Sequence, residues 1–292
     1  MENYCTSCPR HCKTNRVSNV GFCEAKNECI VAKVMLHHWE EPVISGDENS
    51  AGSGAIFFSH CNLKCVYCQN FEISHFETGE KYSPVTLAEL FKKLEKQGAL
   101  NINLVTPTHY AFEILEALQI YKPKIPIVWN TGGFESCEIV EKLKNYVDIF
   151  LTDFKYYSNE LSSKYSSCPN YFENCSKSLL KMREIVPEDI IQNGLMKKGI
   201  IVRHMILPGC TSDSIQILNW IKENLGTKTC ISLMSQYTPC GNAKNFPEIN
   251  RKLKPIEYKI VKNHLLKLGL ENGFLQNLSS ANTCFIPNFD EK

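Results

Sequence analysis

From residue 54 onward, the 292-residue chain alternates short apolar, β-prone runs with longer stretches of helical period. The apolar runs lack alternating polar residues, as expected of strands buried on both faces of a parallel sheet covered by helices. Expected strands fall at 54–58, 102–106, 125–130, 147–154, 199–207 and 230–237. Because six strand–helix units are fewer than the eight of a closed barrel, the pattern predicts an α/β fold, either a partial barrel or an open sheet.

The helices between these strands are marked by apolar stripes and by their ends. Thr86 and Glu89 form a T-x-x-E pattern that predicts a capping box, and Gly98 is expected to end that helix. Apolar residues three or four apart predict further helices at 112–118, 139–143, 172–186, 215–225 and, starting at Pro255, through 268. Residues 1–50 are expected to form a cysteine-rich extension, and residues 51–292 a core domain that includes the C-terminal helix.

Composition excludes several classes of protein. With 43% hydrophobic and 22% charged residues, the chain can bury a full core. A formal net charge of +1 gives no electrostatic footprint for nucleic acid. No apolar run approaches the roughly 20 residues that cross a bilayer, and the polar start MENYCTSCPRHCKTNR lacks the apolar core of a secretory signal. We therefore expect a cytoplasmic protein with no nucleic-acid or membrane partner.

Fifteen cysteines are unevenly distributed along the chain. An odd number in a chain expected to be cytoplasmic argues against a disulfide framework and favours metal binding where the cysteines cluster. One cluster lies in the first thirty residues and another at 61–68. The remaining cysteines stand singly and are expected to be small buried hydrophobes: Cys137, Cys168, Cys175, Cys210, Cys230, Cys240 and Cys284.

The second cluster reads CNLKCVYC, with Cys61, Cys65 and Cys68 spaced C-x3-C-x2-C. A redox pair of the C-x-x-C type would not explain Cys61, and a zinc site would need a fourth ligand close by in the sequence. Three thiolates can instead hold a [4Fe–4S] cluster by three corners, which leaves one iron open to an outside ligand.

The same stretch resembles the signature of the radical S-adenosylmethionine (SAM) superfamily, because Tyr67 precedes the last cysteine and the motif follows the first strand. The resemblance implies that the methionine moiety of SAM supplies the missing ligand of the cluster. It also implies a partial (β/α)6 barrel of the TIM type for the core domain.

Further motifs resemble one group within that superfamily, the PflX group, relatives of pyruvate formate-lyase activating enzymes. These motifs are CTSCPRHC, EEPVISG, GSGAIFFSHCNLKCVYCQN, NINLVTPTHY, DIFLTDFKY, VRHMILPG, SLMSQYTP and FIPNFD (285–290). The resemblance implies an oxidoreductase similar to glycyl-radical-activating enzymes, which cleaves SAM to a 5′-deoxyadenosyl radical that abstracts hydrogen. It implies a low-potential electron donor such as flavodoxin or ferredoxin and a protein or peptide partner, but it names no substrate.

The resemblance also suggests residues that hold SAM. Activating enzymes carry a Gly-Gly-Glu segment after the second strand, where this chain has Thr106 and Thr108 and no carboxylate. The ammonium of SAM would then be held by hydroxyls or backbone carbonyls. At the next two strand ends the corresponding residues are Asn130 and Thr131, then Asp153 and Lys155. Arg203, before Pro208-Gly209, is a further candidate for a contact with a carboxylate or the substrate. An ordinary solvated pair is the alternative for Asp153 and Lys155, and a structural ion pair for Arg203.

The N-terminal cluster comprises Cys5, Cys8, Cys12 and Cys23, with Cys29 as a substitute ligand. Its C-x2-C-x3-C-x10-C spacing offers four thiolates to zinc or to an auxiliary iron–sulfur cluster. The spacing is atypical of zinc ribbons and favours iron–sulfur, with unligated cysteines in an arm as the third alternative.

Two classes of function follow from these motifs. The first is a radical SAM enzyme, and the second is a non-catalytic iron–sulfur module for electron transfer or assembly. The enzyme is favoured because electron-transfer clusters usually have four protein ligands, whereas the 61–68 motif offers three.

Overall fold

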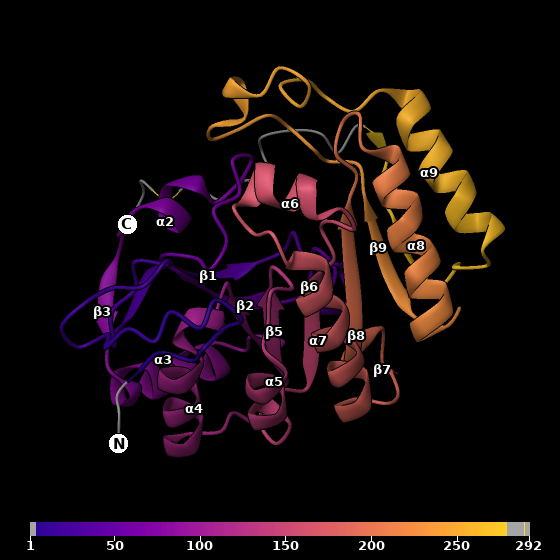
Figure 1. The fold of residues 1–292 in the computed structure, drawn as a ribbon. Coiled ribbons are helices and arrows are strands. Elements are labelled where there is room, and N and C mark those ends of the chain that lie inside the picture. The colour runs from indigo at the N-terminus through magenta and orange to yellow at the C-terminus, as the bar shows by residue number, and fades with distance from the viewer. Residues whose placement is uncertain (1–3, 279–288, 290–292) are drawn as a thin grey trace.

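The computed structural model describes residues 4–278 and 289, and its backbone is built around one ten-stranded sheet (Figure 1). The strands follow the order β10-β9-β8-β6-β5-β4-β2-β1-β3, and β7 pairs with β8 off this path. In the described residues the strands are β1 Cys29–His37, β2 Ser53–Phe58, β3 Glu80–Tyr82, β4 Ile102–Val105, β5 Ile127–Thr131, β6 Ile149–Asp153, β7 Ile190–Gln192, β8 Leu195–Met205, β9 Cys230–Met234 and β10 Gly273–Leu275.

Helices connect these strands and lie mainly on the outer side of the curved sheet (Figure 1). The α-helices are α1 Pro42–Ser45, α2 Phe71–His75, α3 Pro84–Lys96, α4 Ala111–Ile120, α5 Cys137–Leu143, α6 Asn159–Ser166, α7 Tyr171–Ile185, α8 Thr211–Leu225 and α9 Pro255–Lys267. Two 3-10 turns lie at Thr108–Tyr110 and Ala243–Asn245.

The six predicted strands are β2, β4, β5, β6, β8 and β9, and they pair in parallel in that order. Each is followed by at least one helix before the next member of the series. The prediction of a partial (β/α)6 barrel is therefore confirmed. A seventh parallel strand, β10, extends the series at one edge, and antiparallel β1 and β3 extend it at the other.

The interior of the barrel is apolar at one end and polar at the other. Ile44 of α1 is fully buried against Val128, Leu151 and Ile201, which lie on the inner face of three neighbouring strands. Side chains two residues further along a strand point to the same face. The inner face therefore continues from Leu151 to Asp153 and from Ile201 to Arg203, so that the carboxyl end of the barrel is polar.

The start of one predicted helix differs from the structure, whereas its end agrees. The helix α3 begins at Pro84, and Ser83 caps it by accepting a hydrogen bond from the Thr86 backbone N–H at 3.2 Å. The expected capping box at Thr86 and Glu89 is therefore wrong, because proline at the first helical position and serine before it start the helix three residues earlier. The expected end at Gly98 agrees with the end of α3.

The predicted extension at 1–50 contributes to the main sheet, since β1 pairs with β2 over residues 31–37. Ahead of β1, residues 4–28 form a loop closed by a bridge between Tyr4 and Asn15. Cys284 and most of the FIPNFD motif lie outside the described residues.

We expect Gly133 to be essential for stability, because its backbone has a φ of +84° and an added Cβ would lie 2.1 Å from the Asp153 carbonyl oxygen. Gly194 has a similar φ of +77° but open space around it. Both alanine variants incur the strain of a left-handed backbone, but only Gly133→Ala also adds a steric clash. Gly133→Ala should therefore lower the free energy of unfolding by roughly 1–3 kcal/mol more than Gly194→Ala does. Denaturant titration of both variants measures the difference, and equal losses would contradict the prediction.

Candidate active site at the carboxyl end of the barrel

A cavity of about 210 Å³ lies at the polar end of the barrel. Its wall includes all three thiols of the 61–68 motif and residues from the carboxyl ends of β4, β5, β6, β8 and β9. Parallel strands bring their carboxyl ends to one edge, which is where α/β folds usually bind ligands. Of the predicted site residues, the following line the cavity: Tyr67, Thr106, Asn130, Thr131, Asp153, Lys155 and Arg203, together with Cys61, Cys65 and Cys68.

Each thiol of the triad accepts a hydrogen bond. The backbone N–H of Leu63 donates to Cys61 Sγ at 3.4 Å. The hydroxyl of Ser166 donates to Cys65 Sγ at 2.9 Å, and the hydroxyl of Ser74 to Cys68 Sγ at 3.3 Å. Donors of this kind stabilise thiolate more than thiol, which suits cysteines that bind metal.

Burial raises the pKa of all three thiols, to about 11 for Cys65. Mutual repulsion also raises the pKa of Cys61, whereas the positive charge of Lys155 counters the rise at Cys65 and Cys68. Three thiolates on one cavity wall need a positive counter-charge, and a metal centre would provide it.

A chain of hydroxyls supports the cysteine loop from behind. Tyr67 and Tyr156 share a hydrogen bond of 2.6 Å, and Tyr156 shares one of 2.7 Å with the Ser166 hydroxyl that donates to Cys65. The Tyr67 ring lines the cavity, but its hydroxyl is engaged in this chain. Tyr67 therefore positions the loop through Cys65.

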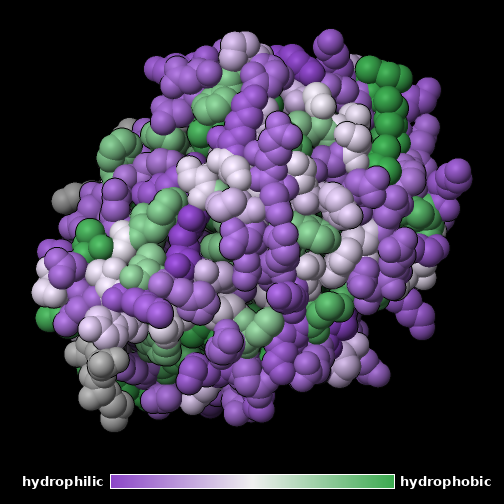
Figure 2. Space-filling model, viewed as in Figure 1, coloured by the Kyte–Doolittle hydropathy of each residue, from purple (hydrophilic) through white to green (hydrophobic). Residues whose placement is uncertain are grey.

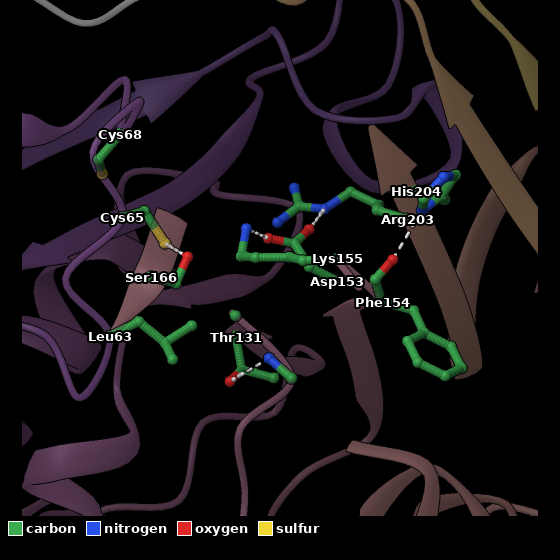
Figure 3. A network of polar contacts seen from close by, with 12 residues as sticks. Leu63, Cys65, Cys68, Thr131, Asp153, Phe154, Lys155, Ser166, Arg203 and His204 are labelled. Carbon is green, nitrogen blue, oxygen red and sulfur yellow. Dashed lines mark hydrogen bonds and ion pairs between the residues drawn. The ribbon is translucent and has the colours of Figure 1, made fainter. Parts of the chain in front are cut away.

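Asp153 is bracketed by two cations (Figure 3). Lys155 Nζ lies 2.5 Å from one carboxylate oxygen and Arg203 Nε lies 2.9 Å from the other. In Figure 3 the Lys155 ammonium lies on the side of Cys65, and Arg203 on the opposite side. The side chains of Asp153 and Lys155 are only 14% and 19% exposed, so the alternative of a solvated surface pair is wrong.

Glu40 completes this network and was not predicted as a site residue. Its carboxylate accepts hydrogen bonds from Asn103 at 3.1 Å, Asn130 at 3.0 Å and Arg203 at 3.1 Å. Arg203 also donates to Asn130 Oδ1 at 2.6 Å. The chain before α1 thus delivers a carboxylate into the barrel, where it contacts residues of three strands.

The network fixes the charges of its members. Burial would raise the pKa of Asp153, but the positive charges of Lys155 and Arg203 outweigh burial and lower it. Burial would likewise lower the pKa of Lys155, but the negative charge of Asp153 outweighs it and raises the pKa. The site therefore presents a fixed ammonium to the cavity beside the triad.

The threonines of the predicted SAM segment are held differently from one another. Thr106 lines the cavity with a φ of +61°, a strained conformation for a β-branched residue. Thr108 is buried and is not among the cavity residues; its hydroxyl donates to Glu135. Thr131 lines the cavity and donates to the same carboxyl oxygen, as does the Trp129 indole N–H at 3.2 Å.

Glu135 is therefore a buried carboxyl directly behind the cavity wall. Burial raises its pKa to about 7, although three donors oppose the rise. Oε1 accepts all three hydrogen bonds, and Oε2 has no hydrogen-bond partner among the described residues. No sequence pattern pointed to this residue.

Two buried histidines, His109 and His204, have structural partners. His204 shares hydrogen bonds with the Phe154 carbonyl at 2.7 Å and the Ser214 hydroxyl at 2.8 Å. His109 shares one with the Ser59 carbonyl at 2.7 Å. Burial lowers the pKa of His204 to about 4 and that of His109 to about 3, so both stay neutral.

The four N-terminal cysteines also come together. Cys5, Cys8, Cys12 and Cys23 line one small apolar cavity, whereas Cys29 is fully buried in β1 and does not line it. Among the described residues, no three or more His, Cys, Asp or Glu side chains converge tightly enough to hold a single metal ion. This holds for the 61–68 triad as well as for the N-terminal set. Each set lines the wall of its own cavity.

The described cysteines that stand singly in the sequence differ in their burial. Cys168, Cys175 and Cys230 are buried, as predicted, whereas Cys137, Cys210 and Cys240 are half-buried. Every described cysteine is free.

Three thiols and a fixed ammonium at the carboxyl edge of a partial barrel define the class of protein that the 61–68 motif predicts. A family model described as the Radical SAM superfamily matches residues 55–221, more than half of the chain. The chain therefore belongs to the radical SAM superfamily, whose members use a [4Fe–4S] cluster and SAM. The finer assignment to the PflX group stays a prediction.

A curated relative is the uncharacterized protein MJ0674 of Methanocaldococcus jannaschii, 32% identical over 262 residues, which cover 85% of this chain and 70% of the relative. Among solved structures, SuiB of Streptococcus suis has a TM-score of 0.53 at 15% identity, covering 76% of this chain and 49% of SuiB. The FeFe-hydrogenase maturase HydG of Carboxydothermus hydrogenoformans has a TM-score of 0.50 at 15% identity, covering 78% and 54%. The chain thus spans about half the length of these solved proteins, and the likeness shows the fold.

In the part of the chain that the structure describes, no helix is long and apolar enough to span a bilayer. The face in Figure 2 is mainly hydrophilic, and its hydrophobic side chains lie in small separate groups.

We expect Glu135 to make stability depend on pH. Its pKa of about 7 in the folded protein lies above the ordinary value of 4.5 for a glutamate, so the folded state binds the proton more tightly. This contribution is full below pH 4.5 and is lost as the pH rises through 7. The difference in unfolding free energy between wild type and Glu135→Gln should fall by roughly 3 kcal/mol between pH 4 and 8.

Urea denaturation at several pH values measures this difference. Glu138→Gln, at an exposed position of α5, serves as the control and should follow the wild-type profile. Parallel profiles for wild type and Glu135→Gln would show that the carboxyl does not titrate in this range.

Proposed function

We propose that the protein reductively cleaves SAM to a 5′-deoxyadenosyl radical, which abstracts hydrogen from a substrate. The observation that carries the proposal is the triad of Cys61, Cys65 and Cys68 on the wall of the 210 Å³ cavity, with the Lys155 ammonium beside it. Membership of the radical SAM superfamily supplies the chemistry. SuiB, a protein of similar fold, has been crystallised with SAM bound.

The residues present suit a three-cysteine [4Fe–4S] cluster. Cys61, Cys65 and Cys68 would hold it, and the hydrogen bonds from Leu63, Ser166 and Ser74 would stabilise their thiolates. When bound, the cluster supplies the electron that cleaves the sulfonium of SAM. The protein orients SAM and keeps the reacting atoms away from water.

The charged network suits the zwitterionic and hydroxyl groups of SAM. Lys155 offers a fixed positive charge to a carboxylate, since its own pairing with Asp153 satisfies one of its three donors. Asn130 and Thr131 lie at the adjacent strand end, where polar groups of the nucleoside can reach them. Thr106 offers its hydroxyl and the strained backbone around it to the ammonium of SAM.

Finer assignments extend this proposal. We place the protein in the PflX group, as a relative of glycyl-radical-activating oxidoreductases, with flavodoxin or ferredoxin as the electron donor. A protein or peptide substrate is supported by the crystal structure of SuiB bound to the precursor peptide SuiA. Free described cysteines and a reducible cluster suit a cytoplasmic location. Cys5, Cys8, Cys12 and Cys23 form a second metal site.

The alternative is a non-catalytic iron–sulfur module. It accounts for the thiols but gives no role to the cavity beside them or to the buried Asp153–Lys155–Arg203 network. An electron-transfer module usually shields its cluster with four protein ligands, and the structure leaves the triad open to a ligand-sized space.

The first test is the production of 5′-deoxyadenosine after anaerobic reconstitution and reduction with dithionite in the presence of SAM. Wild type should produce it, and Cys65→Ala should not, because two thiolates do not keep the cluster intact. Cys137→Ala, a half-buried single cysteine on α5, is the matched control and should stay active. Formation of 5′-deoxyadenosine by Cys65→Ala would overturn the assignment.

A second test concerns the binding of SAM. Lys155→Ala and Asp153→Ala should each weaken SAM binding by about 1–3 kcal/mol, the scale of one charge-assisted hydrogen bond. The absorbance of the cluster should survive in both variants. Anaerobic titration calorimetry measures the affinity, with Lys142→Ala at an exposed position of α5 as the control. Wild-type affinity in both variants would remove the pair from the site.

A further inference from the structure

We propose that the N-terminal cysteines hold a [4Fe–4S] cluster that relays electrons from an acidic protein donor to the cluster at the 61–68 triad. This inference rests on the proposed function and assigns a role to its second metal site. It depends on three features of residues 4–26: the thiol-lined cavity, the contacts that join this segment to the 61–68 loop, and the charge of its outer side.

The first feature is the donor set. Cys8 and Cys23 are buried, and Cys5 and Cys12 are half-buried around the same apolar cavity. Four thiols on one cavity wall form a complete donor set for a metal centre, which would replace their protons.

The loop is shaped around one of these sulfurs. The backbone N–H of Phe22 points to Cys12 Sγ at 3.5 Å, as that of Leu63 points to Cys61 Sγ at 3.4 Å in the triad. Gly21 leaves room for this sulfur, since an added Cβ would lie 3.1 Å from Cys12 Sγ. The same kind of N–H to sulfur contact therefore occurs in both cysteine loops.

The arrangement favours a cluster over zinc. In a tetrahedral zinc site every sulfur lies about 2.3 Å from one point. The described thiols do not converge in this way, and neither does the triad, whose family uses a cluster. A cluster binds each thiolate to a different iron, so its ligands surround a larger space.

Arg10 joins the two cysteine sites. It lies two residues from Cys8 and two from Cys12, and its guanidinium donates to the Asn62 carbonyl at 3.0 Å and the Ser167 carbonyl at 2.7 Å. Asn62 directly follows Cys61. Asn62 is also on the wall of the N-terminal cavity, so one residue separates that cavity from a ligand of the triad.

The second acceptor of Arg10, the Ser167 carbonyl, lies one residue from a side chain that contacts Cys65. Ser167 follows Ser166, whose hydroxyl donates to Cys65 Sγ at 2.9 Å. Arg10 is also held over the ring of Phe22, with 3.4 Å between the guanidinium carbon and the ring centroid. The two carbonyls that accept from Arg10 therefore belong to residues next to Cys61 and next to Ser166, which donates to Cys65. These hydrogen bonds and the intervening covalent bonds form a short path between the two cysteine sites.

The outer side of the loop is suited to an acidic donor. His11 and Lys13 flank Cys12 and are exposed, and Tyr4 and Val17 of the same segment are 51% and 62% exposed. The positive charge of Lys13 and the apolar side chains of Tyr4 and Val17 match a negatively charged, low-potential iron–sulfur or flavin protein.

The electron balance is simple. The donor loses one electron, which passes through the N-terminal cluster to the triad cluster and then into SAM. The carbon–sulfur bond of SAM breaks to give methionine and the 5′-deoxyadenosyl radical. The oxidised donor is the only other product before hydrogen is taken from the substrate.

The experiment uses the full chain, reconstituted anaerobically, as wild type, Cys5→Ala, Cys12→Ala and Arg10→Gln, with Cys137→Ala as control. Wild type should contain about eight irons per chain, and the two cysteine variants about four, as expected for the loss of one cluster. Electron paramagnetic resonance of the reduced wild type should show two interacting clusters. Arg10→Gln should keep about eight irons and weaken that interaction.

The rate of 5′-deoxyadenosine formation is then measured with reduced flavodoxin and with dithionite. The ratio of the two rates should fall at least tenfold in Cys5→Ala and in Cys12→Ala. Lys13→Glu should lower the ratio in the same direction and weaken its dependence on salt, with Lys228→Glu as the surface control.

Stoichiometric zinc in wild type, or about four irons in wild type and cysteine variants alike, would overturn the second cluster. An unchanged ratio in variants that have lost four irons would overturn the relay. Failure of wild type to cleave SAM even with dithionite would instead refute the proposed function, so the two failures are distinguishable.

Discussion

The guanidinium of Arg203 is the charge on which the carboxyl end of the barrel depends. It is largely buried, and its positive charge is balanced by Asp153 on the neighbouring strand and by Glu40 from the segment before α1. Removing one partner of such a buried group leaves an uncompensated charge, which is strongly unfavourable. Because Asp153 is shared with Lys155, the same compensation directs an ammonium toward the thiols of the triad. The cavity and its electrostatics are thus consequences of one network.

The parts of the structure that sequence could predict are those with local causes. Six apolar runs separated by helical stripes predict parallel strands, because the period of hydrophobicity reflects only the neighbours of each residue in the chain. The triad is similarly local, since Cys61, Cys65 and Cys68 lie within eight residues. Asp153 and Lys155 could be predicted because they stand at the end of a recognisable strand. Their burial could be established only from the structure.

The residues that sequence did not reveal act through partners far along the chain. Glu40 lies 163 residues from Arg203, and Ser166 lies 101 residues from Cys65. A glutamate in EEPVISG or a serine before SCP has no local feature that separates it from a surface residue. The capping of α3 failed for a different reason: two start signals lay within three residues, and Ser83 with Pro84 took precedence over Thr86.

Glu135 lies behind the part of the cavity wall that Thr131 forms. A threonine hydroxyl has one donor and two acceptor sites. Thr131 donates to Glu135 and accepts a hydrogen bond from the Gly133 backbone N–H at 3.2 Å, so one acceptor site of its oxygen remains on the cavity wall. The buried carboxyl thereby orients a neutral hydroxyl as an acceptor. The carboxyl group itself lies behind the cavity wall, where burial keeps its pKa near 7 and couples the wall to pH.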